Sequence, residues 1–95
     1  EYLRTRPQEG ATRLALANLL QTAGDYPAAI HEYEEAIRLK PEAVNAHYNL
    51  AVALEKAGQI ERARQEYQTY LQLSPNADDS ADVRAHLKKL GTGGQ

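Results

Sequence analysis

The stretch Leu16–Pro41, LANLLQTAGDYPAAIHEYEEAIRLKP, returns thirty-four positions later as Leu50–Pro75, LAVALEKAGQIERARQEYQTYLQLSP. Aligning Gly10–Ala43 with Val44–Ala77 gives eleven identical pairs, and most of them are small or apolar residues at helical spacings. A fixed period of this length indicates a repeat protein, in which each unit is one supersecondary element. The identical pairs are Leu16/Leu50, Ala17/Ala51, Leu20/Leu54, Ala23/Ala57, Gly24/Gly58, Ala29/Ala63, Glu32/Glu66, Tyr33/Tyr67, Leu39/Leu73, Pro41/Pro75 and Ala43/Ala77.

Each unit has the pattern of two helices separated by a tight turn. In the first unit Leu16 and Leu20 form an apolar stripe, and Gly24 follows at the place where a left-handed residue ends a helix. Asp25 can cap the next helix. Lys40 precedes Pro41, which disfavours helical geometry at Lys40 and so ends that helix. Pro41-Glu42 is then expected to start the following helix. The pattern predicts helices near residues 9–23, 26–40, 43–57 and 60–73.

These units resemble tetratricopeptide (TPR) repeats, whose pattern is W-x2-L-G-x2-Y, then A-x3-F, then P. The first unit gives Arg13-x2-Leu16-Ala17-x2-Leu20, Ala29-x3-Tyr33 and Pro41, and the second gives His47-x2-Leu50-Ala51-x2-Leu54, Ala63-x3-Tyr67 and Pro75. Both depart from the pattern at the Trp position, and Ala replaces Gly. The resemblance implies an all-α fold, a superhelix of antiparallel helix pairs, with repeats at 9–42 and 43–76.

Both ends of the chain differ from a complete repeat. The opening EYLRTRP resembles TYLQLSP at Thr69–Pro75, so residues 1–8 are expected to be the end of a preceding repeat helix or an N-terminal tail. In the first case the apolar face of helix 9–23 is left open. Residues 77–91 are expected to cap the array with a helix from Ser80 to Leu90, which Gly91 stops. Val83, Leu87 and Leu90 form its inner face, and 92–95 is expected to be a flexible tail.

Composition excludes several classes of function. The chain has no Cys, which removes disulfides and thiolate metal sites, and its formal charge of −2 argues against nucleic-acid binding. No apolar run has the roughly 20 residues that span a bilayer, so no membrane insertion is expected. The composition indicates a soluble protein but leaves the compartment open. No catalytic signature and no convergent metal-ligand set is present, so we expect no enzyme activity, no metal and no cofactor.

The expected binding surface is the concave side of the superhelix, lined by the first helix of each pair. Asn amides suit a peptide backbone, and Tyr48 is an aromatic anchor of the kind that interfaces favour. Arg84 and Lys88 could add positive charge at the C-terminal end. The predicted partner-binding residues are Leu14, Asn18, Gln21, Asn45, Tyr48, Asn49, Val52, Arg84 and Lys88, with Ala11 and Glu55 beside them.

Within the resemblance, one TPR subclass binds acidic chaperone C-termini through a carboxylate clamp. Asn18 and Asn49 occupy its asparagine positions, and Arg84 and Lys88 have its basic spacing, but Leu14 replaces its first lysine. The alternative is that both Asn side chains are only polar surface residues.

The leading functional hypothesis is a non-enzymatic scaffold that binds a protein or peptide partner in the concave groove. A second hypothesis is an assembly element, a homo-oligomer formed through the open N-terminal face. The shortage of repeats favours it, because about three are usually needed for stability. Glu32, Glu34 and Glu35 form an acidic cluster on helix 26–40, which is expected to be a solvated convex surface.

Overall fold

The computed structural model describes residues 9–93, which form five α-helices and no β-strand. The expectations for residues 1–8 therefore lie outside the described residues. The first four helices begin and end within one residue of the predicted boundaries. The helices are α1 (Glu9–Thr22), α2 (Tyr26–Leu39), α3 (Val44–Lys56), α4 (Ile60–Leu73) and α5 (Ser80–Gly93).

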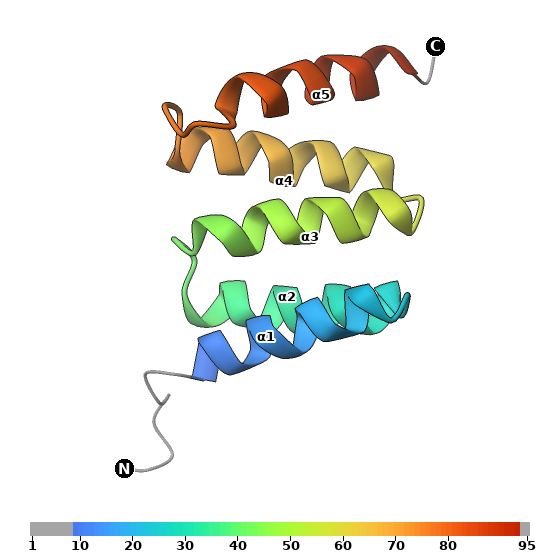
Figure 1. Cartoon of the computed structure of the whole chain (residues 1–95), viewed down its shortest axis with the longest axis vertical. Coiled ribbons are helices and arrows are strands. Elements are labelled where there is room, and N and C mark those ends of the chain that lie inside the picture. Colours follow the sequence, from blue (N-terminus) through green and yellow to red (C-terminus); the bar gives the residue numbers. More distant parts are fainter. Residues whose placement is uncertain (1–8, 94–95) are drawn as a thin grey trace.

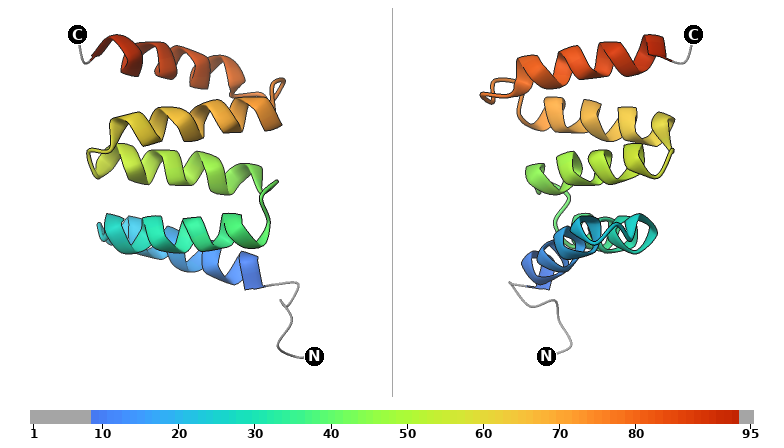
Figure 2. Two further views of the ribbon diagram at one scale, coloured as in Figure 1. Left: turned by 180° about the vertical axis from the view of Figure 1, so that it is seen from behind. Right: turned by 45° about the vertical axis from the view of Figure 1, so that its right-hand side comes forward.

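The helices stack as antiparallel neighbours in the order of the sequence (Figure 1). The two further views in Figure 2 show α1 paired with α2 at one end of the stack and α5 covering α4 at the other. The molecule is consequently long and thin, with principal extents of 50 × 29 × 18 Å. This is the quasi-one-dimensional arrangement of a helical repeat, in which each element packs mainly on its neighbours.

The turn inside each helix pair is set by a glycine in the left-handed conformation. Gly24 and Gly58 both have φ of 88°, a region that costs other L-residues energy. After Gly24, the amide of Asp25 donates to the carbonyl of Leu20 at 2.9 Å, and Gly24 itself donates to Gln21 at 3.0 Å. These two bonds are the Schellman pattern, and they satisfy carbonyls at the end of α1. The predicted helix-ending role of Gly24 is confirmed.

The predicted cap and stop of α2 are also confirmed, whereas the predicted role of Pro41-Glu42 as the start of α3 is wrong. The Asp25 carboxylate accepts from the Ala28 amide at 3.4 Å, and α2 ends with Lys40 as its C-cap. Pro41 and Glu42 do not begin the next helix but form a turn, and Ala43 is the N-cap of α3. The amide of Ala43 donates to the carbonyl of Lys40 at 3.0 Å, and this bond closes the turn.

The core is built from small residues at helix crossings and a few large ones between them. Ala17, Ala29, Ala51 and Ala63 have no exposed surface. Their small side chains allow close approach of the helix axes. The largest fully buried side chains are Tyr33, Leu50 and Leu54. These residues come from the repeated positions, so the sequence period predicts the core.

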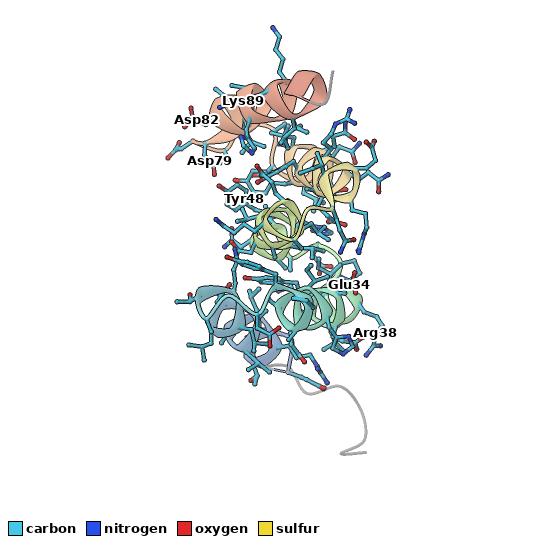
Figure 3. The ribbon with its side chains drawn as sticks, turned by 90° about the vertical axis from the view of Figure 1, so that its right-hand side faces the viewer. Glu34, Arg38, Tyr48, Asp79, Asp82 and Lys89 are labelled. Atoms are coloured by element: carbon cyan, nitrogen blue, oxygen red, sulfur yellow. The ribbon has the colours of Figure 1, made fainter. Side chains whose placement is uncertain are left out.

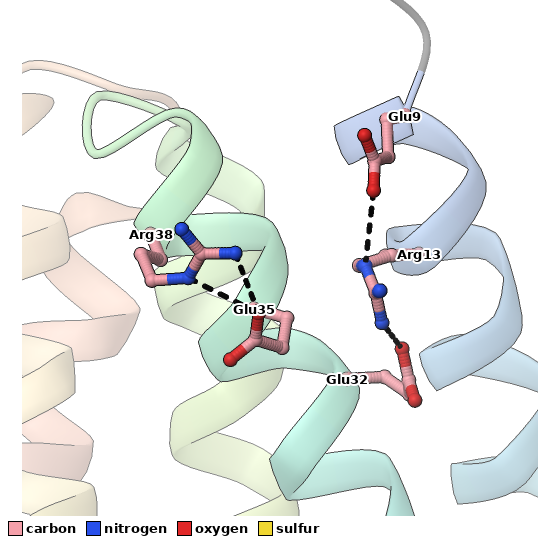
Figure 4. Close-up of polar contacts among 5 residues, drawn as sticks. All are labelled: Glu9, Arg13, Glu32, Glu35 and Arg38. Carbon is pink, nitrogen blue, oxygen red and sulfur yellow. Dashed lines mark hydrogen bonds and ion pairs between the residues drawn. The ribbon is translucent and has the colours of Figure 1, made fainter. Parts of the chain in front are cut away.

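The first helix of each pair is also joined to the second by a side-chain contact to a glutamate at equivalent positions. Arg13 Nη1 lies 2.7 Å from Glu32 Oε1, and thirty-four positions on, His47 Nδ1 lies 2.7 Å from Glu66 Oε1. Figure 4 shows Arg13 held between Glu9 and Glu32. The departure from the family pattern at the Trp position is thus matched by a glutamate that both repeats share.

The expected acidic convex surface requires a correction. Glu32, Glu34 and Glu35 are not a free cluster, because each carboxylate has a basic partner. Glu35 pairs with Arg38 one turn along α2 at 2.8 Å (Figure 4), and Glu34 pairs with Arg62 of α4. The arginine beside Glu35 holds the pKa of that carboxyl below its usual value. The cluster therefore contributes to contacts between helices as well as to solvation.

The exposed face of α1 departs from strict repeat symmetry. Leu50 is 1% exposed and Ala53 is fully buried, whereas their counterparts Leu16 and Leu19 are 43% and 69% exposed. This exposure agrees with the expectation of an open apolar face on helix 9–23. The cause is position in the stack, since α3 lies between α2 and α4 whereas α1 packs mainly on α2.

The C-terminal helix continues past its predicted end. Val83 is buried and Leu87 and Leu90 pack against the core, as the amphipathic pattern predicts. Gly91, however, does not stop the helix, which runs to Gly93, so the expected tail at 92–95 begins in helix. Within residues 9–93 only Gly24 and Gly58 have positive φ, so Gly91 keeps a helical backbone.

We predict that Leu50→Ala and Leu16→Ala differ sharply in stability although they occupy the same repeat position. Leu50→Ala should lower the free energy of unfolding by about 2–5 kcal/mol, the usual cost of a buried leucine truncation. Leu16→Ala should cost less than about 1.5 kcal/mol, because solvent already reaches the side chain. Urea denaturation followed by circular dichroism measures both. Equal losses in the two variants would show that α1 is covered in solution.

Candidate functional site

The two sides of the stack differ in which helices form them. In a view roughly down the helix axes, α1, α3 and α5 lie on one side of the stack and α2 and α4 on the other (Figure 3). Tyr48, Asp79 and Asp82 are on the first side, which we call the α1–α3–α5 face, and Glu34 and Arg38 are on the opposite side. The helices that the sequence predicts to line a binding surface are therefore together on one face.

A pocket of about 580 Å³ opens at the C-terminal end of this face, between α3 and α5. Its volume is within the range of about 300–1,000 Å³ that is typical of ligand sites. We call it the C-terminal pocket. Its lining residues are Tyr48, Val52, Glu55, Lys56, Tyr67, Asp79, Asp82, Val83 and His86.

Three tyrosines form the aromatic part of this region. The ring of half-buried Tyr48 lies 5.8 Å from that of Tyr67 in an edge-to-face arrangement and 5.4 Å from that of Tyr70. Aromatic pairs in this distance range attract one another beyond their area of burial. Tyr48 is therefore held in one orientation by buried neighbours while part of its ring remains open to a ligand.

Glu55 is the polar centre of the pocket. Its Oε1 accepts from the Tyr67 hydroxyl at 3.0 Å and lies 2.8 Å from His86 Nε2 of α5. The rings of Tyr67 and His86 also meet edge to face at 5.3 Å. Burial, then the hydrogen bond to Glu55 and its negative charge, raise the pKa of Tyr67 well above its usual value. The hydroxyl thus stays a donor, and it fixes the position of the carboxylate.

A second tyrosine fixes a second carboxylate at the edge of the pocket. The hydroxyl of Tyr70 donates to Asp79 Oδ1 at 2.5 Å. This hydrogen bond, followed by burial, raises the pKa of Tyr70 to about 12. Ser80 supports the same loop, because its hydroxyl donates to the carbonyl of Ser74 at 2.9 Å. The loop between α4 and α5 is therefore tied to α4 by side chains that the repeat period does not supply.

Some of the predicted binding residues line the pocket, and the others lie outside it. Tyr48 and Val52 line the pocket. Asn45 is exposed on α3, whereas Leu14 packs against the core. Arg84 donates from Nη2 to the carbonyl of Pro75 at 2.9 Å, and neither it nor exposed Lys88 lines the pocket.

Three of the predicted amide residues lie away from the pocket, and each forms a hydrogen bond within the protein: Asn18, Gln21 and Asn49. The hydroxyl of buried Tyr33 donates to Asn18 Oδ1 at 2.5 Å and is 2.8 Å from Gln21 Oε1. Asn49 Nδ2 donates to the same oxygen of Asn18 at 3.4 Å. The two asparagines of the clamp pattern are thus adjacent, but the oxygen of Asn18 already serves Tyr33.

Sequence reasoning assigned six of the pocket residues to no site. It predicted Tyr67 and Val83 as packing residues and gave no binding role to Lys56, Asp79, Asp82 and His86. The thirty-four-residue period cannot place Asp79, Asp82 or His86, because the loop after Pro75 breaks the repeat register. The available signal is local: Asp79 and Asp82 are three positions apart at the start of a helix and so share a face.

Neither a metal centre nor a membrane span is found in the described part of the chain. Residues 9–93 contain no group of three or more His, Cys, Asp or Glu side chains that could hold a metal ion. None of the five described helices combines the length and apolar character needed to cross a bilayer.

Comparison with protein families gives one match, to the tetratricopeptide repeat model over residues 14–78. Repeats of this family generally mediate protein–protein interactions and are typically non-enzymatic. A comparison with curated proteins gives no match. The matched residues begin within α1 and extend into the loop before α5, so they include both helix pairs.

The buried tyrosines make the fold sensitive to alkali. Burial raises the pKa of Tyr33 to about 12, above the value of about 10 in an unfolded chain. Neutral Tyr33 therefore contributes stability that is fully present below about pH 10 and is lost as the pH rises towards about 12.

We predict that Tyr33→Phe loses less stability than the parent chain between neutral pH and about pH 12. The difference in that loss should be on the order of 2–3 kcal/mol. At neutral pH the variant should be weaker by about 1 kcal/mol, for the lost hydroxyl bonds to Asn18 and Gln21. Urea denaturation at a series of pH values checks both, and identical pH profiles would contradict the assignment.

Proposed function

Because the chain belongs to the tetratricopeptide repeat family, we propose that it is a protein–protein interaction module that binds a peptide or partner helix along its α1–α3–α5 face. The observation that carries this proposal is the C-terminal pocket, which opens on that face and exposes part of Tyr48. A fixed aromatic ring in a concave site is the usual anchor of a protein interface, since it buries a large area at a low entropic cost.

The remaining residues of the face extend the same surface away from the pocket. Asn45 and Asn49 lie on α3 beside Tyr48, with amide groups that can donate to and accept from a peptide backbone. Val52 adds apolar surface one turn further along α3. A bound segment would thus meet polar groups along α3 and an aromatic anchor at the pocket.

We predict that the intact chain selects peptides from a library of short random peptides displayed on phage, and that Tyr48→Ala weakens their binding at least about tenfold. Tyr26→Ala is the matched control, because Tyr26 is also half-buried but does not line the pocket. Dissociation constants come from fluorescence anisotropy, and circular dichroism verifies that each variant is folded. The proposal fails if no peptide is selected, or if both variants bind the selected peptides as the parent does.

A second candidate function, self-association, is favoured by the exposed apolar face of α1. Uncharged exposed residues form a stripe on one side of that helix and into the turn after it: Thr12, Leu16, Leu19 and Ala23. A second copy offers the same stripe, so a two-fold pairing of α1 with α1 buries leucine against leucine. Pairing of α1 with the outer side of α5 is less favourable, because it would bury the exposed charges of Arg84 and Lys88.

Self-association predicts a mass that rises with concentration from the micromolar to the millimolar range in analytical ultracentrifugation. Leu19→Lys should raise the dimer dissociation constant more than about tenfold, since it places two charges in the interface. Leu73→Lys is the matched control, as Leu73 is 41% exposed on α4. A monomer at all concentrations, or equal effects of the two substitutions, would exclude pairing through α1.

A further inference from the structure

The C-terminal pocket has an unequal distribution of charge. Three carboxylates line it, from Glu55, Asp79 and Asp82, against the one ammonium group of Lys56, with His86 neutral or positive. Lys56 is exposed in the last turn of α3. A concave site lined mainly by one sign of charge concentrates ligand groups of the opposite sign. The pocket therefore favours a cation over an anion.

Two of the carboxylates are fixed before any ligand arrives. Tyr67 and His86 hold Glu55, and Tyr70 holds Asp79, each through a hydrogen bond to one carboxylate oxygen. Such bonds keep the carboxylates from reorienting, so a ligand would not have to order them on binding. Asp82 also lines the pocket, and it is exposed.

Aromatic rings form another side of the same space. Tyr48 and Tyr67 both line the pocket, and their mutual contact places the two rings at an angle of 67° to each other. The face of a tyrosine ring attracts a guanidinium or ammonium group within about 6 Å of its centroid. Carboxylates beside aromatic faces are thus suited to a long basic side chain, whose stem packs on a ring while its charged end meets an acid.

We propose that the C-terminal pocket receives a lysine or arginine side chain of the peptide bound on the α1–α3–α5 face. This inference rests on the proposed peptide-binding function and adds the chemistry of the partner to it. It is opposite to the carboxylate-clamp pattern, which requires cations where an acidic peptide end binds. Arg84, the nearest candidate for such a cation in that pattern, is bound to the carbonyl of Pro75 and does not line the pocket.

The test uses the peptides selected on phage by the intact chain. We expect lysine or arginine to be enriched in them, and replacement of that residue by uncharged norleucine or citrulline to weaken binding about tenfold. This is the sum expected for one cation–aromatic contact and one or two exposed ion pairs.

The variant Asp79→Asn/Asp82→Asn tests whether the basic residue of the peptide binds at these two carboxylates. Asparagine retains an acceptor for the Tyr70 hydroxyl, so the loop should stay folded, which circular dichroism verifies. In this variant the same peptide replacement should change the dissociation constant only about threefold, because the contact with the aromatic rings and with Glu55 remains. Glu34→Gln/Glu35→Gln is the matched control, because it removes the same charge from two residues of α2 that do not line the pocket, and it should keep the tenfold effect; Glu34 lies on the opposite side of the stack (Figure 3).

The outcomes separate the two proposals. If no peptide is selected, peptide binding and the basic-residue pocket fail together. If peptides bind and Tyr48→Ala weakens them, but basic residues are not enriched, only the pocket assignment is overturned. It is likewise overturned if the uncharged replacement costs the same in the parent chain and in Asp79→Asn/Asp82→Asn.

Discussion

The burial of one tyrosine in each helix pair is the interaction on which the rest of the structure depends. Tyr33 and Tyr67 occupy the same repeat position and are almost fully buried, where the family pattern has phenylalanine. A buried hydroxyl must find a partner, and in each pair it reaches the residue twelve positions earlier, Gln21 or Glu55. The hydroxyl of each buried tyrosine therefore forms a hydrogen bond between the core and a polar residue of the α1–α3–α5 face.

This connection gives the two repeats different polar groups on that face. In the first repeat Tyr33 meets two neutral amides, whereas in the second Tyr67 meets a carboxylate that also contacts His86. The loop before α5 then brings Asp79 beside the same aromatic group through Tyr70. A difference of one residue type at an equivalent position thus changes the chemistry of the face without changing the fold.

The sequence predicts the fold well because the features that set it are local and repeated. Gly24 ends α1 and Lys40 ends α2 through backbone preferences that act within a few residues. The repeat pattern by itself cannot distinguish Leu16 from Leu50, whose exposures differ because of what lies beside each helix. Gly91 is a related case: glycine permits a helix to end but does not require it.

The candidate site was predicted only in part, because some of its residues lie outside the repeated units. Tyr48 follows from the repeat, while Asp79 and His86 reach the pocket through a loop outside the period.

The contacts between helices have a mechanical consequence for the pocket. Within residues 9–93 the backbones of α3 and α5 do not pack directly on each other, since α4 lies between them in the stack. The hydrogen bond of Glu55 to His86 joins the two helices across the opening. A helical stack bends more easily where only side chains bridge two of its helices. The pocket end of the molecule is therefore expected to be easier to deform than an end held by direct helix packing. Loss of this hydrogen bond would release a side-chain link between α3 and α5 and let the pocket widen. The elasticity of the stack would then let ligands of different width enter, and discrimination would come from charge more than from size.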